Sequence, residues 1–407
     1  MPTLVQINVS RNWGSTGRIA EGIALVAQEQ GWKCYIVHGQ RYKSISQFQS
    51  FQVSNRIEEL WHYTQSLLFD KQGQGSTCAT KRLVKHLSSI KPDIIHLHVI
   101  HGSYLNYPIL FDYIKKNEIP VVWTFHDCWA FTGHCTYFDR IGCNKWRSKC
   151  FDCPQIHEYP KSIIDCSNRN YNLKKATYSK DVNLTIVPVS EWLGGLVAKS
   201  FLGKFPIQVI HNGIDLRKFK ASSANIRAKY VIDSSKHIVL GVANGYGKRK
   251  GLSDFVRLSE TLPKDFLIVM VGVLPDDKKN IPDTIVTICR TGNQQELVDL
   301  YSSADVFVNP TYEDNFPTTN LEALACGTPV ITYNTGGSPE AIDQYTGKVV
   351  ARGNIEALRQ AVVEVVSAGK DSFSYACRLR ASKCFNRTDR FYEYIELYMK
   401  ILNKKNK

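Results

Sequence analysis

The amino-acid sequence predicts an α/β protein built from two doubly wound domains. Short β-branched and apolar runs alternate with longer stretches of helical periodicity along the whole chain, which is typical of parallel βαβ units. The alternation starts afresh after a polar stretch at 218–225. We therefore predict one Rossmann-like domain at 1–206, a second at 207–385, and a C-terminal helix with a basic tail at 386–407.

Ten apolar runs are the expected strands. Those of the first domain are Leu4–Val9, Cys34–Val37, Ile94–His98, Val121–Phe125 and Leu184–Val189; those of the second are Ile238–Ala243, Phe266–Val273, Ile285–Ile288, Val306–Asn309 and Val330–Tyr333. The last segment predicts an amphipathic helix packed on the body, because apolar residues recur there at helical spacing: Phe391, Tyr394, Ile395, Tyr398 and Leu402. Ligands of doubly wound domains bind beyond the carboxyl ends of the strands, so we expect the site there, facing the cleft between the domains.

Composition excludes several classes of protein. The chain has 407 residues, of which 43% are hydrophobic and 22% charged, which is unlike a disordered, collagenous or coiled-coil chain. No uncharged apolar run reaches the roughly 18 residues of a transmembrane helix, and residues 1–10 lack the basic and apolar regions of a signal peptide. These observations predict a cytoplasmic protein.

The net charge of +14 indicates an anionic partner. A basic surface attracts nucleic acid, anionic lipid or phosphorylated substrates. Residues 1–206 carry 24 basic and 15 acidic side chains, an excess of +9, and residues 140–180 alone carry nine basic and three acidic. This short segment is either a solvated loop or a binding face.

A strand, a loop and a helix are expected around residues 314–327, whose sequence is DNFPTTNLEALACG. Asn315 is the expected N-cap, Pro317 falls in the first turn, and Gly327 is a good terminating residue. The N-terminus of such a helix offers backbone N–H groups and a positive dipole end to a phosphate. The alternative is an ordinary strand–loop–helix unit with surface acids.

Two acids lie eight residues apart, Asp314 and Glu322, and the second begins the run EALACGTPV; this pattern resembles the donor-site signature of the retaining GT-B glycosyltransferases of family four. The resemblance implies two Rossmann-like domains and transfer of a sugar from a nucleotide diphosphate to an acceptor hydroxyl. It implies catalytic roles for Asp314 and Glu322 and donor contacts from Asn315, Phe316, Thr318, Thr319 and Glu322. The sequence departs from the family at Asp314, where Glu is usual, and at Asn315 and Pro317, where Gly is usual.

A basic turn, Lys248-Arg249-Lys250-Gly251, precedes an expected helix at Leu252–Leu262. The resemblance implies that Arg249 and Lys250 bind the donor diphosphate, whose negative charge grows as the glycosidic bond breaks; a solvated turn is the alternative. Because the sequence has no Asp-x-Asp motif, we expect transfer without a metal ion and no cofactor required for catalysis.

In the first half, a glycine loop and a histidine follow two expected strands. The loop containing Gly14, Gly17 and Arg18 precedes a helix expected at Ile19–Gln30, and the resemblance implies that it borders the diphosphate and the acceptor. His126 ends the strand Val121–Phe125, and the resemblance implies that it bonds the donor sugar and is catalytic. The alternative is a histidine of the protein core whose hydrogen bonds are all made within the fold. In the donor domain, Gly336 and Gly337 are expected to let the backbone approach the ligand closely.

An insert at 128–166 contains four of the twelve cysteines within a span of nineteen residues: Cys135, Cys143, Cys150 and Cys153. His134 is adjacent to the first of them. Structural zinc is the leading interpretation because the last pair is spaced C-x2-C and disulfides are rare in a reducing compartment. Disulfides and unliganded small apolar side chains remain open. A similar insert occurs in glycosyltransferases that resemble the colanic acid and capsule subgroup, whose N-terminal domain binds the acceptor.

The sequence therefore predicts a retaining hexosyltransferase whose partners are a nucleotide sugar and a glycan or lipid-linked acceptor of a bacterial surface polysaccharide. The basic N-terminal half is expected to contact the anionic inner leaflet of the cytoplasmic membrane. The alternatives are a sugar-nucleotide epimerase of the same fold, and a nucleic-acid-binding protein that uses the basic insert. Because the chain lacks an aromatic stacking platform or a base-reading helix, we expect no nucleic-acid partner.

Overall fold

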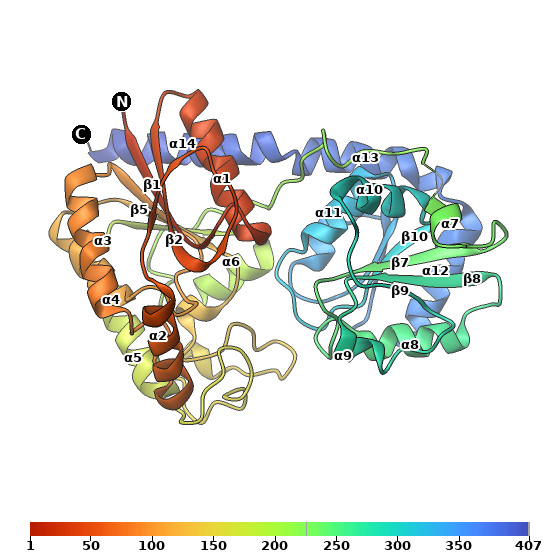
Figure 1. The fold of residues 1–407 in the computed structure, drawn as a ribbon, viewed down its shortest axis with the longest axis horizontal. Coiled ribbons are helices and arrows are strands. Elements are labelled where there is room, and N and C mark those ends of the chain that lie inside the picture. Colours follow the sequence, from red (N-terminus) through yellow and green to blue (C-terminus); the bar gives the residue numbers. More distant parts are fainter. Residues whose placement is uncertain (225, 406–407) are drawn as a thin grey trace. The chain divides into compact units, whose positions relative to one another are not determined.

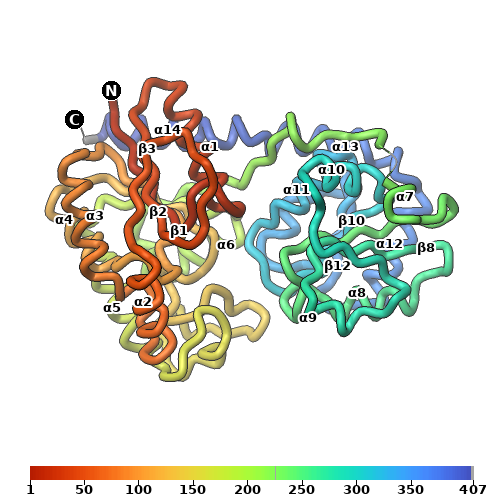
Figure 2. The backbone as a smooth tube through the Cα atoms, in the orientation of Figure 1, coloured from red at the N-terminus to blue at the C-terminus, as the bar shows by residue number. Residues whose placement is uncertain are grey.

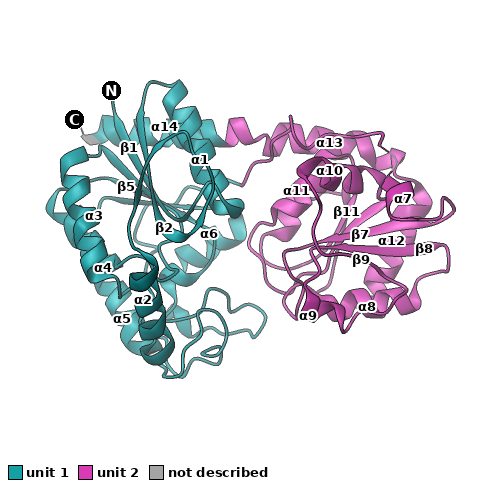
Figure 3. Ribbon diagram, in the orientation of Figure 1, with its two compact units in different colours: residues 1–211, 391–407 teal, residues 212–390 magenta. Residues whose placement is uncertain are grey.

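The computed structural model describes residues 1–224 and 226–405. The predicted polar stretch 218–225 therefore ends outside the described residues, as do the last two residues of the predicted tail. The chain forms two compact units (Figure 3), unit 1 at 1–211 with 391–407 and unit 2 at 212–390. The predicted boundaries, 206/207 and 385/386, lie about five residues before these limits.

Unit 1 contains a parallel sheet (Figure 1), whose strands lie in the order β3-β2-β1-β4-β5-β6. Its strands are β1 Thr3–Arg11, β2 Lys33–Lys43, β3 Gln49–Gln52, β4 Ile94–Leu97, β5 Val121–Phe125 and β6 Leu184–Pro188. Its helices are α1 Gly14–Glu29, α2 Arg56–Phe69, α3 Thr77–Ile90, α4 Tyr107–Lys116, η1 Trp129–Phe131, η2 Lys145–Arg147, α5 Ser167–Thr177 and α6 Glu191–Ala198.

Unit 2 contains a second parallel sheet, with the order β12-β11-β10-β7-β8-β9. Its strands are β7 His237–Val242, β8 Phe266–Val271, β9 Val286–Ile288, β10 Val306–Asn309, β11 Val330–Tyr333 and β12 Gly347–Val350. Its helices are α7 Ile226–Lys229, α8 Leu252–Thr261, α9 Pro275–Lys278, α10 Gln294–Ser303, α11 Thr318–Ala325, η3 Ser338–Ala341, α12 Ile355–Ala368 and α13 Asp371–Phe385. Counted along the chain within each unit, both sheets have the order 3-2-1-4-5-6 of a doubly wound fold.

The two faces of the first sheet are buried by different helices because side chains alternate along a strand. Val5 packs in a core with α3, α4 and α6, whereas Leu4 packs in a separate core with α1 and α14, Arg387–Lys405. The tube in Figure 2 shows α14 returning to unit 1 at the end of the chain. The predicted amphipathic helix is thereby confirmed: Phe391, Tyr394, Ile395 and Tyr398 are buried in this core, and Leu402 packs against it.

Two strands and two helix starts differ from the predictions. β3 and β12 pair at sheet edges, and their sequences, QSFQ and GKVV, carry little apolar signal. α1 begins at Gly14 instead of after Arg18, so the predicted glycine loop is the first turn of the helix. α11 begins at Thr318 with Pro317 at the N-cap, so the predicted cap at Asn315 is wrong. Proline fits this position because it has no N–H to lose.

Candidate active site

The basic turn after β7 and the loop after β10 are joined by side-chain and backbone contacts. Lys250 Nζ forms an ion pair with the carboxylate of Asp314. Arg249 Nη1 donates to the carbonyl oxygen of Glu313 at 2.8 Å, and the carbonyl oxygen of Arg249 accepts from the N–H of Tyr312, also at 2.8 Å. Both segments follow strands that neighbour each other at the switch point of the sheet, where doubly wound folds bind ligands.

The charges of this cluster keep Asp314 ionised. Burial acts to raise the pKa of this carboxyl, but the positive charges of Lys250 and Arg249 outweigh it and hold the pKa below its ordinary value. The side chains of Lys250 and Asp314 remain 18% and 15% exposed, so solvent reaches both. Lys250 and Arg249 are the two cations that this cluster offers to a phosphate group.

The start of α11 is fixed to the sheet by Asn320, a residue that sequence reasoning missed. Its Oδ1 accepts from Asn309 Nδ2 at 2.9 Å, and its Nδ2 donates to Ser338 Oγ at 3.0 Å. Thr318 and Thr319 lie half-buried in the first turn, where backbone N–H groups have no partner inside the helix. The signal that could have found Asn320 is a polar residue on the apolar side of a predicted helix.

Glu322, one turn into α11, is oriented by a buried tyrosine. The hydroxyl of Tyr301 donates to Glu322 Oε2 at 3.0 Å, while Glu322 itself is half-buried. Burial, followed by the charge of Glu322, raises the pKa of Tyr301 well above its ordinary value, so the hydroxyl remains a donor. Tyr301 lies on α10 and gave no sequence signal beyond an apolar position.

Asn315 and Phe316 lie in the interior of unit 2. They are only 2% and 3% exposed, and the ring of Phe316 packs against Phe385 at 5.6 Å between centroids. Gly336 packs against the same loop: a Cβ there would lie 1.9 Å from the carbonyl oxygen of Asp314. The close approach expected of this glycine is therefore made to the loop after β10.

In unit 1, the predicted glycine segment begins α1. Gly17 packs against the end of β1, where an added Cβ would lie 2.7 Å from Ser10 Oγ. Gly14 has a φ of +66°, a backbone conformation that favours glycine. A Cβ added there would meet no atom of the described residues within 4 Å, so packing does not restrict this position. Arg18 is exposed, one turn into the helix. Gly17 thus has a packing role, and Arg18 is available to a ligand.

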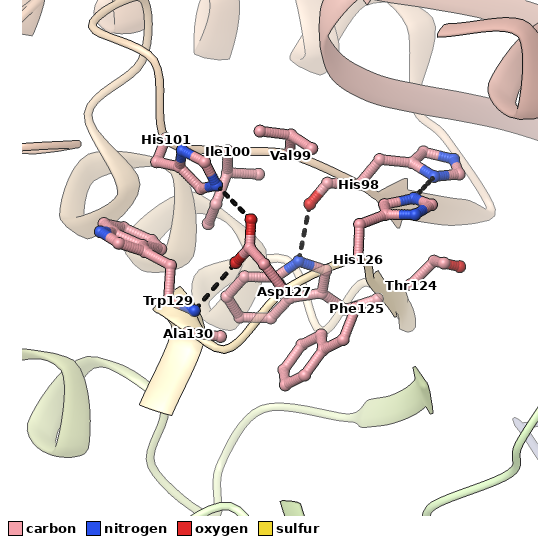
Figure 4. A pocket seen from close by; sticks show the side chains of 11 residues that line it. His98, Val99, Ile100, His101, Thr124, Phe125, His126, Asp127, Trp129 and Ala130 are labelled. Carbon is pink, nitrogen blue, oxygen red and sulfur yellow. Dashed lines mark hydrogen bonds and ion pairs between the residues drawn. The ribbon is translucent and has the colours of Figure 1, made fainter. Parts of the chain in front are cut away.

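A pocket lies beyond the carboxyl ends of β4 and β5, and Figure 4 shows His126 and Asp127 in its wall. His126 Nε2 lies 3.3 Å from His98 Nδ1, and His98 Nε2 contacts Gln6 Oε1 at 2.8 Å. Asp127 is held by His101 Nε2 at 2.9 Å and by the N–H of Trp129 at 2.9 Å. The prediction that His126 directly follows the strand Val121–Phe125 is confirmed, and its catalytic role stays a prediction.

Burial determines the protonation of this pocket. It lowers the pKa of His126 to about 4, against the opposing charge of Asp127. Burial also lowers the pKa of His98 well below its ordinary value. Both imidazoles are neutral at pH 7, so each ring has one N–H to donate and one nitrogen to accept a hydrogen bond.

Comparison with known families decides the identity of the chain. Residues 17–218 match the family described as Glycosyltransferase Family 4, and residues 222–376 match Glycosyl transferases group 1. Together the two matches cover most of both units. The chain belongs to these glycosyltransferases.

Relatives of this glycosyltransferase extend over the whole chain. The Escherichia coli K12 protein WcaC, assigned to colanic acid biosynthesis as a glycosyl transferase, is 23% identical over 98% of this chain and 100% of its own. Sucrose-phosphate synthase from Thermosynechococcus elongatus superposes with a TM-score of 0.72 at 16% identity, over 99% and 100% of the two chains. Anabaena HepE, solved with UDP-glucose, gives 0.68 at 12% identity, over 98% and 99%. The fold is GT-B, as predicted.

The glycosyltransferase carries its cysteine cluster in the insert that follows Asp127. Cys135, Cys143, Cys150 and Cys153 are not in disulfide bonds. The hydrogen bond from the Cys135 thiol lowers the pKa of Cys153 below its ordinary value. Among the described residues, no three His, Cys, Asp or Glu side chains already stand in the arrangement of a metal site. The predicted zinc therefore stays a prediction.

Proposed function

We propose that this glycosyltransferase moves a sugar from a nucleoside diphosphate sugar to a hydroxyl of a glycan or lipid-linked acceptor in polysaccharide biosynthesis, with retention of configuration and without a metal ion. The observation that carries the proposal is the cluster of Lys250, Arg249 and Asp314 beside α11. Support for the substrate class comes from WcaC, assigned to colanic acid biosynthesis, and from HepE, which binds UDP-glucose.

Lys250 and Arg249 would bind the diphosphate, together with the N–H groups of Thr318 and Thr319 at the start of α11. These donors are already oriented, so they stabilise the charge that develops on the leaving diphosphate more than they stabilise the bound donor. Glu322, held by Tyr301, would accept from ribose hydroxyls of the nucleotide. Asp314 would hold a hydroxyl of the transferred sugar, because its pKa keeps it ionised and therefore an acceptor.

In the reaction, the bond between the anomeric carbon and the diphosphate oxygen breaks, and the acceptor oxygen bonds to that carbon from the same face. The proton of the acceptor hydroxyl passes to the departing phosphate oxygen, so charge and atoms balance. Neutral His126 would donate a hydrogen bond to a sugar, and the exposed Arg18 would contact a phosphate or the acceptor. The contribution of the chain is positioning and electrostatic stabilisation.

The test follows product formation with single nucleotide sugars and a panel of glycan and lipid-linked acceptors. We expect nucleoside diphosphate release that depends on acceptor and persists in chelator, and a product whose anomeric configuration by NMR equals that of the donor. Inverted configuration would overturn the retaining assignment. An epimer formed from the sugar nucleotide alone, without acceptor, would overturn glycosyl transfer itself.

We also propose that unit 1 contacts an anionic membrane surface through α2. The apolar residues Ile57, Leu60 and Trp61 are exposed on this helix by 78%, 63% and 63%. The insert continues the surface, because the N–H of Ile163 donates to the carbonyl oxygen of Leu67 at 2.7 Å. Ile163 is exposed, as is the neighbouring Lys161. Exposed apolar residues with basic neighbours suit the boundary of an anionic bilayer.

Flotation with vesicles of phosphatidylglycerol and phosphatidylethanolamine tests this contact. We expect binding that weakens with salt and falls at least about tenfold in Trp61→Asp, since burial of this side chain in lipid stabilises binding by over about 1.4 kcal/mol. The control is Tyr375→Asp, an equally apolar surface change on α13, where Tyr375 is 71% exposed. Equal binding by both variants would contradict the proposal. No helix among the described residues is long and apolar enough to cross a bilayer.

A further inference from the structure

The four cysteines of the insert line a single cavity in unit 1. Its wall contains Cys135, Cys143, Cys150 and Cys153, together with His134 and the rings of Phe138, Trp146 and Phe151. The thiols of Cys135 and Cys153 are in hydrogen-bond contact, although eighteen residues separate them. A stretch of chain with little regular secondary structure therefore brings four cysteine side chains to the wall of one cavity.

Backbone N–H groups point at two of these sulfur atoms. The N–H of Gly133 donates to Cys150 Sγ at 3.2 Å. The backbone of Gln155 donates to Cys153 across the turn formed by Pro154. An N–H donor stabilises a thiolate more than a thiol, because hydrogen bonds to charged groups are the stronger ones. The turns are thus shaped for sulfur in its metal-binding form.

His134 supplies an independent observation. Its Nδ1 bonds to Asp70 Oδ1 at 2.6 Å, and both side chains are buried. Its Nε2 is buried as well and has no hydrogen-bond partner among the described residues. Buried polar atoms are nearly always satisfied. Because Nδ1–H donates to Asp70, Nε2 is a donor only when the ring carries a proton on both nitrogens, and a metal-bound thiolate in the same cavity would be the acceptor for that second N–H.

Lys174 of α5 places a buried basic group beside the cluster, and burial lowers its pKa to about 7. It is 1% exposed, and its ammonium donates to the carbonyl oxygens of Trp129 and Thr132 at 2.5 and 3.0 Å. Cys150 and Cys135 are among the groups in its electrostatic surroundings. A buried ammonium costs free energy unless negative charge lies nearby, and a divalent cation held by four thiolates carries a net charge of −2.

We propose that the insert binds one zinc ion through the thiolates of Cys135, Cys143, Cys150 and Cys153, with a doubly protonated His134 donating from Nδ1 to Asp70 and from Nε2 to one of these thiolates. Four sulfur ligands are a donor set that zinc takes in structural sites. Because the side chains are not yet in ligand arrangement, binding would draw the sulfurs together as the thiols release their protons to solvent, as is usual for metal sites.

Such an ion would hold the insert to the wall of the His126 pocket. The insert reaches that pocket through Tyr159, whose hydroxyl contacts His101 Nδ1 at 3.1 Å, and through Trp129, whose N–H is bound by Asp127. His101 in turn holds Asp127. The role of the zinc is therefore structural, and it is separate from the sugar-transfer chemistry proposed above.

Metal analysis of the full-length protein, purified under reducing conditions without a metal-affinity step, tests the site. We expect about one zinc per chain in the wild type, and loss of most of it in Cys150→Ser and Cys153→Ser. The matched controls are Cys78→Ser and Cys289→Ser, which alter exposed cysteines outside the insert and should keep the zinc. A wild type without metal, or one whose mass shows the four thiols paired as disulfides, would overturn the proposal.

A second measurement does not depend on the folding of the cysteine variants. Wild-type protein stripped of zinc and titrated with cobalt(II) should develop the intense sulfur-to-cobalt charge-transfer band of a tetrahedral four-thiolate site. His134→Gln should keep that band while binding zinc about 10- to 100-fold more weakly, as expected for a residue that bonds a ligand. If the cobalt(II) spectrum of His134→Gln differed from that of the wild type by the loss of a nitrogen ligand, His134 would be a ligand and the four-cysteine assignment would be wrong.

Discussion

Lys250 and Asp314 are 64 residues apart in the sequence, and their ion pair joins the turn after β7 to the loop after β10. The pair holds two functional groups at one place before any donor binds. An orientation set by folding needs no reorganisation during the reaction, which is the main source of electrostatic catalysis. The same reasoning applies to Glu322, whose orientation depends on the hydroxyl of Tyr301.

Substitution of Lys250 or of Glu322 should therefore remove transfer activity and leave the fold intact. We expect Lys250→Ala and Glu322→Ala each to lower kcat by at least about 100-fold, because each removes a group aimed at the donor. Lys248→Ala is the matched control, since Lys248 is an exposed lysine of the same turn. Initial-rate kinetics and a thermal melt check both statements. Near wild-type turnover in either variant would remove that residue from the site.

The neutral histidines of unit 1 predict how stability depends on pH. Burial lowers the pKa of His62, which lies inside unit 1 on α2, and of His126 to about 4, whereas the pKa of an unfolded histidine is near 6.5. Their folded pKa values are lowered, so their contribution to stability is fully present above about pH 6.5 and is lost as the pH falls toward about 4. Each contributes up to about 3 kcal/mol.

Urea denaturation across this range checks the prediction. The free energy of unfolding of the wild type should fall as the pH drops below about 6.5, and the fall should be shallower in His62→Gln. An equal dependence on pH in both proteins would mean that His62 does not remain neutral in the folded chain. Because His126 stays neutral at pH 6.5, we expect the pH profiles of transfer activity in the wild type and in His126→Gln to have the same shape around that pH.

At the scale of elements, α14 completes the first domain by packing on α1. A Cβ added at Gly22 of α1 would lie 2.2 Å from the ring of Phe391, so only glycine allows the two helices this approach. The sequence placed both helices, but it contained no sign that a helix at the end of the chain covers a sheet formed by its beginning.

Gly22→Ala should thus destabilise unit 1 by about 1–3 kcal/mol, the usual cost of overpacking. Gly195→Ala is the matched control, because Gly195 also lies in a helix, α6, and its added Cβ would meet nothing within 4 Å. That change should be neutral or stabilise by up to about 1 kcal/mol, since alanine favours helix. Chemical denaturation compares the two. Equal stabilities would show that Phe391 moves aside without cost.

At the scale of the whole molecule, donor binding should raise the melting temperature by mass action. UDP, GDP and dTDP sugars would be compared at about 100 times the dissociation constant, where a ligand that binds only the native state stabilises by about 2.7 kcal/mol. The cognate donor should raise Tm by several degrees in the wild type and not in Lys250→Ala. A shift of equal size in both proteins would show that the donor binds away from the basic turn.

The sequence by itself determined the elements whose signals are local. The β-branched runs predicted the inner strands of both sheets, the apolar spacing of 391–402 predicted α14, and the acids around α11 indicated a glycosyltransferase. These signals survive without tertiary structure because they are read from residues that lie a few positions apart.

Only the tertiary structure decided what depends on contacts between distant residues. The edge strands β3 and β12 take their structure from pairing with a neighbour. Asn320 and Tyr301 matter through the side chains that they meet across the fold. The neutral state of His126 follows from burial, which removes the imidazole from water and disfavours its charged form. No local pattern in the sequence predicts how deeply a side chain is buried or which side chain it contacts there.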